Sequence, residues 1–321
     1  MQKPWLSVLI PTYNGENYLK SALDSILLQN DDAIECILVD DGSQDNTLAI
    51  AKSYQDKLPL IVIPRQRQGN WVRNTNYALA LAEGEYVCFL HQDDLWHKNR
   101  LSTMKRLTEE YPEVNLLLHS SWFIDSNGNS LGLWQCPLPK YPQLIDSSIA
   151  IERLLIQNFI AIAAPIFKRD VALEVGKLDE TLWYTADWDF WLKIAASGNT
   201  VYYPQALTSF RIHPNSQTVL GSSSQAEFKQ QMQSVVEKHL LRWQADQNRK
   251  QQTSQVALFS TEVNTTLAAM IHRQQTNMSK LLYSFVNLGP NGWHRYLRDS
   301  RIQERVAARL KAKLKVKPVS S

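Results

Sequence analysis

Two adjacent carboxylates, Asp93 and Asp94, come shortly after an apolar, β-prone run at Glu85–Leu90. A short apolar run that ends at turn residues is typical of a strand buried on both faces. Neighbouring carboxylates repel each other, so a fold normally presents them to water, to a cation or to a helix N-terminus. The pair therefore predicts either a cation site at the end of this strand or the cap of a helix that begins near Lys98.

Two earlier apolar runs also end in polar or acidic residues. Leu6–Ile10 is followed by Pro11–Gly15, and Ile34–Val39 is followed by Asp40–Ser43. The carboxyl ends of parallel strands meet at one edge of a sheet, where open α/β sheets bind their ligands. In a parallel sheet these loops and the acidic pair would line one crevice. A crevice rich in carboxylates and without Lys or Arg suits a hydroxyl-rich ligand and a divalent cation.

The elements that must position these loops are strands that alternate with helices of ten or more residues, which predicts βαβ units and a parallel sheet. In the first hundred residues we expect strands at Leu6–Ile10, Ile34–Val39, Leu60–Ile63 and Glu85–Leu90, with helices over 18–27, 43–54 and Trp71–Glu83. The glycine patterns GxGxxG and GxxxxGK(S/T) do not occur. Their absence argues against a dinucleotide dehydrogenase and a P-loop NTPase.

The later part of the chain changes character near residue 220. Before it we expect helices at Arg100–Tyr111, Ile149–Gln157 and Thr185–Ser197, strands at Val114–His119, Ile160–Phe167 and Val201–Tyr203, and a hairpin turn at Asp125–Gly128. Beyond it, Gln, Ser and charged residues in helical patterns continue through Leu310. The prediction is an α/β domain over residues 1–220 and a helical extension over 221–321.

Composition limits the class of protein. Of 321 residues 44% are apolar and ten are Trp, which indicates a packed core. The three cysteines form no CxxC pair, as in reduced proteins without a zinc centre. The N-terminus meets Pro11 too early for a secretory signal, and no apolar run reaches the ~20 residues of a membrane span. These features predict a cytoplasmic location.

Several segments together resemble one known family. PTYNG after the first strand, VDDGS after the second and FLHQDDLW after the fourth are similar to the motifs of family 2 glycosyltransferases, and so are RQRQGNWVRN, residues 175–198 and FRIH at 210–213. The resemblance covers roughly residues 5–220 in order. It implies a GT-A-like (Rossmann-like), mostly parallel mixed sheet flanked by helices, and an inverting transferase that uses nucleotide-diphosphate sugars.

The resemblance also assigns residues to the donor site. Those expected to contact the nucleotide sugar are Pro11, Thr12, Tyr13, Asp40, Asp41, Arg73, Asn74, Gln92 and Arg211. A carboxylate at Asp40 or Asp41 would accept from the imide N–H of a pyrimidine, which favours UDP- or dTDP-linked donors. The alternatives are a turn and helix cap for Asp40 and Asp41, and a solvated helix face for Arg73.

The acidic motif departs from the family pattern, which commonly has Asp-x-Asp-Asp where this chain has His91-Gln92-Asp93-Asp94. Asp93 matches the residue that contacts the cation, and His213 matches a position near the cation or the diphosphate. Mg²⁺ or Mn²⁺ is the implied cofactor. His91 would ligate Mn²⁺ more readily than Mg²⁺, or else it is only a polar strand end.

Asp187 is the expected catalytic base. It lies where the family has Glu-Asp-x-Asp, with Ala186 in place of Glu, and inverting transfer needs one base to take the acceptor's hydroxyl proton. Desolvation among neighbouring tryptophans would raise the pKa of Asp187. The alternative role of Asp187 is to cap a helix. Asp189 is the second choice of base. Arg211 would offset the charge that develops on the diphosphate.

The C-terminal segment 293–317 is strongly basic. Ile302, Val306, Leu310 and Leu314 recur every four residues beside Arg301, Arg305, Arg309, Lys313 and Lys317. Such a helix would either lie on the anionic inner face of a membrane or pack on the domain with a solvated basic face. Nucleic acid is not an expected partner, because the rest of the chain is mildly acidic.

The expected acceptor is a saccharide or a polyprenyl- or lipid-linked hydroxyl, in cell-surface polysaccharide or glycolipid synthesis. Two other functions stay open at this point. One is a sugar-1-phosphate nucleotidyltransferase, although its Gly-rich, Arg-containing loop is absent after the first strand, where PTYNG stands. The other is a lapsed transferase that only binds sugar nucleotide or glycan, suggested by His91 and Ala186.

Overall fold

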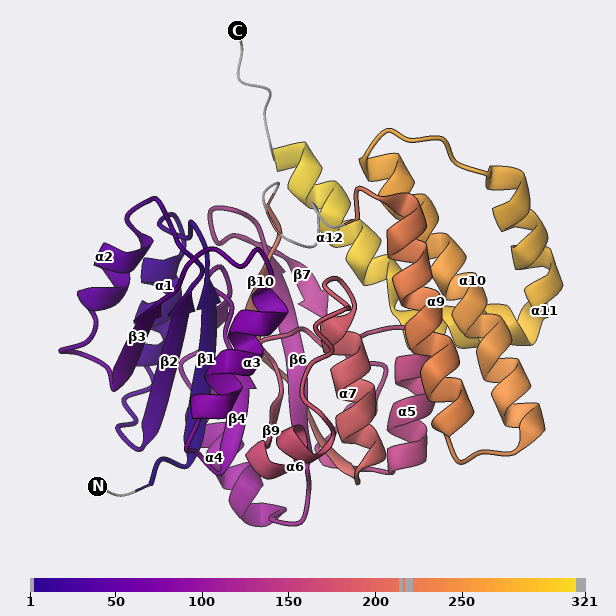
Figure 1. Ribbon diagram of the computed structural model, residues 1–321. Coiled ribbons are helices and arrows are strands. Elements are labelled where there is room, and N and C mark those ends of the chain that lie inside the picture. Colours follow the sequence, from indigo (N-terminus) through magenta and orange to yellow (C-terminus); the bar gives the residue numbers. More distant parts are fainter. Residues whose placement is uncertain (1–2, 214–215, 217–221, 316–321) are drawn as a thin grey trace, which may run out of the picture.

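The fold is described from a computed structural model over residues 3–213, 216 and 222–315, with side chains to residue 312 (Figure 1). One mixed sheet runs through the α/β part, and its main path has the strand order β3-β2-β1-β4-β9-β6-β10-β5. The strands on this path are β1 (Leu6–Thr12), β2 (Ile34–Asp40), β3 (Leu60–Pro64), β4 (Tyr86–Phe89), β5 (Leu95–Trp96), β6 (Leu116–Ile124), β9 (Ile166–Lys168) and β10 (Thr200–Arg211). Two further strands, β7 (Ser130–Trp134) and β8 (Gln143–Ile145), pair with β6 and β10.

The first four strands confirm the predicted parallel unit. β1 pairs in parallel with both β2 and β4, and β2 pairs in parallel with β3. Beyond β4 the sheet becomes mixed, because β9 runs antiparallel to both β4 and β6 while β6 and β10 are parallel to each other. The carboxyl ends of β1, β2 and β4 therefore lie at one edge, as expected.

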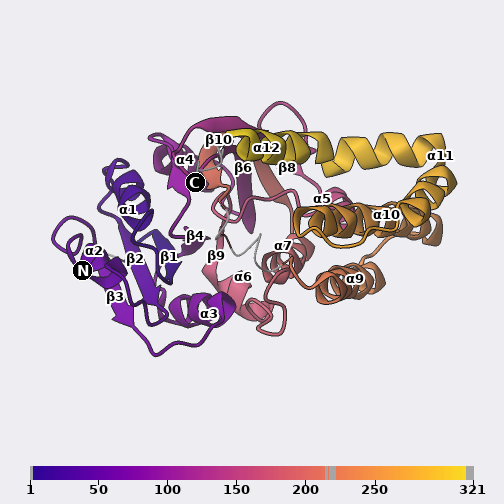
Figure 2. The ribbon, with the colours of Figure 1, turned by 90° about the horizontal axis from the view of Figure 1, so that it is seen from above.

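Helices cover both faces of the sheet (Figures 1 and 2). Alternate residues of β1 point to opposite faces: Val8 packs in one apolar cluster and Leu9 in another. The Val8 face is covered by α1 (Leu19–Leu27), α2 (Thr47–Lys52) and α4 (Arg100–Glu110). The Leu9 face is covered by α3 (Trp71–Leu81), α5 (Ser147–Ile156) and α7 (Ala186–Ala196), and the short α6 (Arg169–Glu174) follows β9.

The predicted strand at Ile160–Phe167 is wrong for most of its length. Only Ile166–Lys168 forms a strand, and the preceding residues form a buried loop. A short apolar run indicates that a segment is buried but not which backbone conformation it adopts, so it does not distinguish a buried strand from a buried loop. The strand expected at Val201–Tyr203 is, in contrast, longer than predicted. It extends to Arg211, with irregular register against β6.

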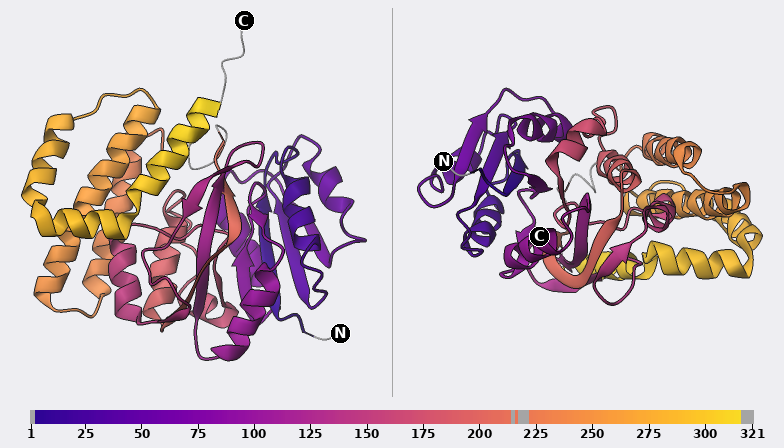
Figure 3. Two further views of the ribbon diagram at one scale, coloured as in Figure 1. Left: turned by 180° about the vertical axis from the view of Figure 1, so that it is seen from behind. Right: turned by 90° about the horizontal axis from the view of Figure 1, so that it is seen from below.

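The helical extension comprises α9 (Gln225–Arg242), α10 (Gln247–Ile271), α11 (Met278–Ser300) and α12 (Ile302–Lys315). A kink interrupts α11 at Gly289, which has φ +66° and precedes Pro290. Figure 3 shows α9, α10 and α11 at the far end of the sheet from β3, while α12 returns along the α/β part. The predicted boundary near 220 falls at residues outside the described part of the chain.

The extension shares its core with the α/β part. Phe228, Met232 and Val235 of α9 belong to the same apolar cluster as Trp188 and Trp191 of α7. Within the described residues no helix is long and apolar enough to cross a membrane.

Candidate active site

A cleft of about 450 Å³ opens at the carboxyl ends of β1, β2 and β4. Its volume falls within the ~300–1,000 Å³ range usual for small-molecule sites. Six of the residues predicted to contact the donor line it: Pro11, Thr12, Tyr13, Asp41, Asn74 and Gln92. The two residues predicted to bind the cation, Asp93 and His213, line it as well. Three predicted residues, Asp40, Arg73 and Arg211, are not among its lining residues.

The two carboxylates after β2 have different roles. Asp40 is fully buried and accepts hydrogen bonds from Ser43 N–H (2.9 Å) and Ser43 Oγ–H (2.5 Å), so it holds the turn. Asp41 lines the cleft and accepts from the backbone N–H groups of Gln68 (2.7 Å) and Gly69 (3.0 Å). Burial alone would raise the pKa of Asp41, but hydrogen bonds from Asn74 and these amides hold it below its usual value. Asp41 is therefore ionised.

Arg67 is a cleft residue that the sequence did not single out. It pairs with Asp41, and its guanidinium lies 3.5 Å from the centre of the Tyr13 ring. The predicted crevice without Lys or Arg is thus wrong, because Arg67 covers the aromatic face on which a flat base would stack. Arg73 extends the other way and forms an ion pair with Glu180 at 3.4 Å, on the exposed side of α3.

Gln92 joins the loops after β1 and β4. Its Oε1 accepts from Tyr13 N–H (2.8 Å), and its Nε2–H donates to the Tyr13 carbonyl (3.1 Å). A Cβ atom at Gly15 would lie 2.4 Å from Gln92 Oε1, so a glycine is needed to leave the bridge intact. Gln92 lines the cleft, but the bridge gives it a positioning role there.

Asp93 and His213 meet at the cleft, although 120 residues separate them in the chain. His213 Nε2 lies 2.9 Å from Asp93 Oδ2. Burial alone would raise the pKa of Asp93, but the hydrogen bond from His213 and the neighbouring imidazoles hold it below its usual value. A carboxylate beside an imidazole fits a divalent cation, and Mn²⁺ better than Mg²⁺.

Asp94 and Arg211 hold the loop that carries Asp93. Asp94 is 1% exposed and accepts from Arg211 N–H (3.1 Å), and burial together with the Asp93 charge raises its pKa well above the usual value. Arg211 donates from its guanidinium to the carbonyls of Asp93 (2.8 Å), Asp125 (3.0 Å) and Ser126 (3.1 Å). Arg211 is outside the lining of the cleft, and these contacts hold the acidic loop in position.

His91 does not join a three-ligand set. Within the described ranges no group of three or more His, Cys, Asp or Glu side chains is arranged around a metal position. His91 is packed edge-on against Trp71 (5.2 Å between ring centres), its Nε2 is buried without a hydrogen-bond partner in that part of the chain, and burial lowers its pKa. A cation in the cleft would rest on Asp93 and His213, with remaining ligands from phosphate oxygens and water.

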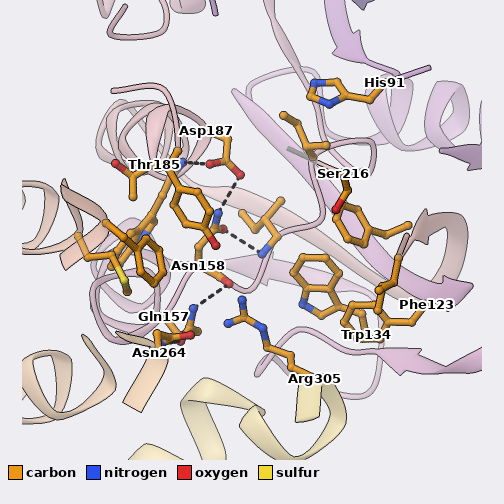
Figure 4. A pocket seen from close by; sticks show the side chains of 18 of the residues that line it. His91, Phe123, Trp134, Gln157, Asn158, Thr185, Asp187, Ser216, Asn264 and Arg305 are labelled. Atoms are coloured by element: carbon orange, nitrogen blue, oxygen red, sulfur yellow. Dashed lines mark hydrogen bonds between the residues drawn. The ribbon is translucent and has the colours of Figure 1, made fainter. Parts of the chain in front are cut away.

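A second pocket, of about 160 Å³, adjoins the cleft and contains Asp187 (Figure 4). The two hollows share five lining residues: Trp71, His91, Trp183, Phe210 and Ser216. The cleft and the second pocket are thus neighbouring parts of one site. The second pocket has mainly aromatic walls, which suit the faces of sugar rings.

Asp187 lies in the first turn of α7 with its carboxylate in this pocket. Its Oδ2 accepts from Asn158 Nδ2–H (2.9 Å) and its Oδ1 from Trp188 N–H (2.8 Å). Burial raises the pKa of Asp187 to about 6, and these two hydrogen bonds limit the rise. A carboxylate with this pKa is a competent general base near neutral pH.

Asp189, the second choice of base, points elsewhere. It is fully buried and contacts Lys193 (3.0 Å), Lys238 (2.8 Å) and His239 (2.8 Å), so it joins α7 to α9. Burial opposes its ionisation, but these partners hold its pKa far below the usual value.

The basic stripe of α12 is turned partly inward. Arg305 and Arg309 line the pocket that contains Asp187. Arg301 contacts Glu304 and Gln135. Of the predicted apolar stripe, Ile302 and Val306 pack in an apolar cluster with Tyr296, whereas Leu310 is 56% exposed. Lys313, Leu314 and Lys317 lie outside the residues whose side chains are described.

Solved structures with the same overall arrangement define the class of fold. TarS from S. aureus in complex with UDP-GlcNAc superposes with a TM-score of 0.68, covering 96% of this chain and 90% of that one at 20% identity. The mannosyltransferase PcManGT from Pyrobaculum calidifontis, in complex with GDP-Man and Mn²⁺, gives 0.57 over 99% and 89% at 15% identity. The chain has the GT-A-like α/β fold with a helical C-terminal region.

Sequence comparison gives the family. The profile described as Glycosyl transferase family 2 matches residues 7–148. An uncharacterised glycosyltransferase of Rickettsia typhi is 30% identical over 227 residues, which cover 70% of this chain and 69% of that one. Another from Nostoc sp. is 27% identical over 237 residues, 72% of each chain. The chain belongs to glycosyltransferase family 2 and is a glycosyltransferase.

Proposed function

We propose that this glycosyltransferase moves a sugar, with inversion, from a nucleotide-diphosphate donor in the cleft to a hydroxyl group held in the adjoining pocket. The observation that carries the proposal is the placement of Asp187, a half-buried carboxylate whose pKa is raised to about 6, in a pocket that shares its wall with the Asp93–His213 cleft. A base and an acidic cation-binding pair on the two sides of one site are what an inverting transfer requires.

In this mechanism the donor's anomeric carbon lies between the two hollows. The acceptor hydroxyl gives its proton to Asp187 as its oxygen attacks that carbon, and the bond from the carbon to the diphosphate oxygen breaks. The products are the glycoside and the nucleoside diphosphate, and Asp187 carries the proton. A divalent cation bound by Asp93 and His213 would offset the charge that develops on the leaving diphosphate.

The donor is proposed to be UDP- or dTDP-linked. Asp41 is ionised and lies in the cleft beside the Tyr13 ring, so it would accept from the imide N–H of a pyrimidine stacked near that ring. Stacking there would displace the Arg67 guanidinium. The likeness to TarS, solved with UDP-GlcNAc, supports a uridine donor, and the PcManGT complex with Mn²⁺ supports the cation.

The wider setting is proposed from the sequence: a cytoplasmic enzyme with a saccharide or lipid-linked acceptor, in polysaccharide or glycolipid synthesis. Contact with an anionic membrane through residues 293–317 stays a prediction, and its basic stripe is reduced because Arg305 and Arg309 line the pocket. Among the side chains described in this segment, Leu310 and Leu297 (45% exposed) are the large apolar ones open to a lipid surface.

The deciding experiment measures donor binding and donor turnover separately. Purified protein is titrated calorimetrically with UDP and dTDP, with and without Mn²⁺, and donor hydrolysis is then followed by release of the nucleoside diphosphate. Asp93→Asn should remove the effect of Mn²⁺ on UDP affinity, while Asp45→Asn, on the loop after β2 but outside the cleft lining, should retain it. Donor binding without hydrolysis or transfer to any of a broad set of acceptors would contradict the enzymatic proposal and favour a binding protein.

A further inference from the structure

The pocket that contains Asp187 has an unusual charge. Its lining includes two arginines from α12, Arg305 and Arg309, and a single carboxylate, Asp187. His91 also lines it. Arg305 points into the pocket beside Trp134, and in the view of Figure 4 Asp187 occupies the opposite wall. The pocket therefore carries more positive than negative charge.

Arg305 is a half-buried cation without an ion-pair partner among the described residues. Its Nη1 is inaccessible to solvent and has no hydrogen-bond partner in the described part of the chain. Burial, and then repulsion from Arg309, lower its pKa to about 10, so it still carries its charge at neutral pH. Residues 214–215 and 217–221, which the structure does not describe, contain no Asp or Glu.

Three arginines that lie just before Arg305 in the chain do have carboxylate partners. Arg295 pairs with Glu152 (2.5 Å), Arg298 with Asp299 (2.7 Å), and Arg301 with Glu304. Neither Arg305 nor Arg309 forms an ion pair with a described residue. A buried charge normally has a partner, because removing it from water otherwise costs several kcal/mol.

Asp187 does not supply the missing anion. Among the influences on the pKa of Asp187, burial is the largest and raises it, whereas Arg305 is the smallest of those that lower it. The carboxylate is instead held by Asn158 and Trp188. Both of its oxygens therefore have N–H partners, and no ion pair joins it to either arginine in the described part of the chain, so the arginines remain free to bind another anion.

We propose that the acceptor carries a phosphate or carboxylate group, which Arg305 and Arg309 bind while a hydroxyl of the same molecule lies at Asp187. Guanidinium groups match both oxyanions through paired N–H donors. The aromatic walls, in which Phe123 stacks on Trp134 at 4.9 Å and Phe210 packs edge-on, would contact the carbon skeleton of a sugar or polyol. This inference rests on the proposed transfer reaction and specifies its acceptor as an anionic one.

The test compares three sugars that share one ring and differ in the group at C6, which is neutral in one and anionic in the other two. Glucose, glucose 6-phosphate and glucuronic acid are titrated by calorimetry into full-length protein saturated with UDP and Mn²⁺, so that the nucleotide cleft is already filled. We expect at least one charged sugar to bind ~10-fold or more tightly than glucose. Whichever of the two binds more tightly identifies the preferred oxyanion. Equal binding of all three, or no binding, would overturn the proposal, and so would inorganic phosphate binding as tightly as the charged sugar.

Variants then locate the effect. Arg305→Gln and Arg309→Gln should each remove most of the charge preference, and Arg305→Lys should retain part of it. Lys311→Gln takes the same charge from an exposed position of α12 outside the pocket lining and should retain all of it. Thermal unfolding identifies any variant that loses structure. If Arg305→Gln unfolds, Arg309→Gln takes its place as the test variant. A preference that survives both neutral substitutions refutes the assignment.

Failure of the transfer reaction would be separately visible. If UDP does not bind or a nucleotide sugar is never turned over, the proposed function fails, whatever the sugars do. If UDP binds and turnover occurs but the charged sugars show no advantage, only the acceptor assignment fails.

Discussion

Asp187 and Asp189 lie two residues apart on α7, yet their surroundings shift their pKa values in opposite directions. Asp187 faces a mainly aromatic pocket and is supported by neutral N–H donors, so burial dominates and its pKa rises to about 6. Asp189 is surrounded by Lys193, Lys238 and His239, which favour its ionised form. Two carboxylates whose pKa values are separated in this way divide chemical and structural work between them.

The first prediction concerns Asp187 as the base. Asp187→Asn keeps the size of the side chain but cannot accept the proton, so transfer should fall ~10²–10⁴-fold, the usual contribution of a general base. UDP affinity should stay at the wild-type value, since Asp187 does not line the cleft. In the wild type, kcat/KM should fall about tenfold per pH unit below pH ~6, where the base becomes protonated. Near-wild-type turnover by the variant would remove Asp187 from this role.

The second prediction tests the support of that base. Asn158 donates to Asp187 Oδ2 at 2.9 Å and thereby lowers its pKa. Asn158→Ala should raise the pKa of Asp187, so the acidic limb of the pH–rate profile should move to higher pH. Asn264→Ala is the matched control, because Asn264 lines the same pocket but bonds to Gln157 at 2.7 Å. An unchanged acidic limb in Asn158→Ala would argue against the hydrogen bond.

At the scale of elements, the contact between α7 and α9 fixes the helix that carries the base. Asp189 on α7 binds Lys238 and His239 on α9, beside the shared apolar cluster of Trp188, Phe228 and Met232. Movement of α9 would therefore displace the first turn of α7, where Asp187 lies. The helical extension would thus influence the proposed base, Asp187, through this contact.

The third prediction is the cost of removing that contact. Asp189→Asn leaves buried cations without their anion and should lower the free energy of unfolding by about 3–5 kcal/mol at neutral pH. The pKa of Asp189 is lowered in the folded state, so its stabilisation is present above the unfolded-state value of ~3.9 and is lost as the pH falls through the folded-state value. The gap between wild type and variant should therefore narrow below pH ~4.

Denaturant unfolding at several pH values measures this difference. Asp170→Asn is the control, because the Asp170 side chain is 93% exposed and its ion pair with Arg169 should contribute little. A loss of stability in Asp189→Asn as small as that of the control would contradict the bridging role of Asp189.

Local patterns predicted the elements with strong periodicity and the loops at their ends. The parallel unit β1–β4 and the convergence of Asp41 and Asp93 follow from apolar runs that end in polar residues. Contacts that depend on how the elements pack together could not be predicted from the sequence. Asn158 meets Asp187 only through the docking of α5 beside α7, and nothing in the spacing of Arg73 and Asn74 showed which one faces the cleft.

At the scale of the whole molecule, different parts of the chain build the two hollows. The donor cleft is lined mainly by residues 11–94, with a few from later segments. The adjoining pocket is lined by residues from 71 onward and is completed by Arg305 and Arg309 from α12. The return of α12 along the α/β part, visible in Figure 1, thus joins the end of the chain to the site. Donor binding and acceptor binding should be separable by changes to α12.

The fourth prediction uses the packing of α12 to separate them. Ala308 is 1% exposed and packs with Phe123, Leu131 and Trp134, so Ala308→Phe would overfill this cluster, at a cost of about 1–3 kcal/mol, and displace α12. Because Arg305 and Arg309 would move with the helix, transfer should fall at least ~10-fold while UDP affinity stays unchanged. Ala307→Phe places the same ring at an exposed position of the same helix and should retain transfer. Loss of UDP binding in Ala308→Phe without unfolding would show that α12 also shapes the donor cleft. Wild-type transfer by Ala308→Phe would show that the pocket does not depend on the position of α12.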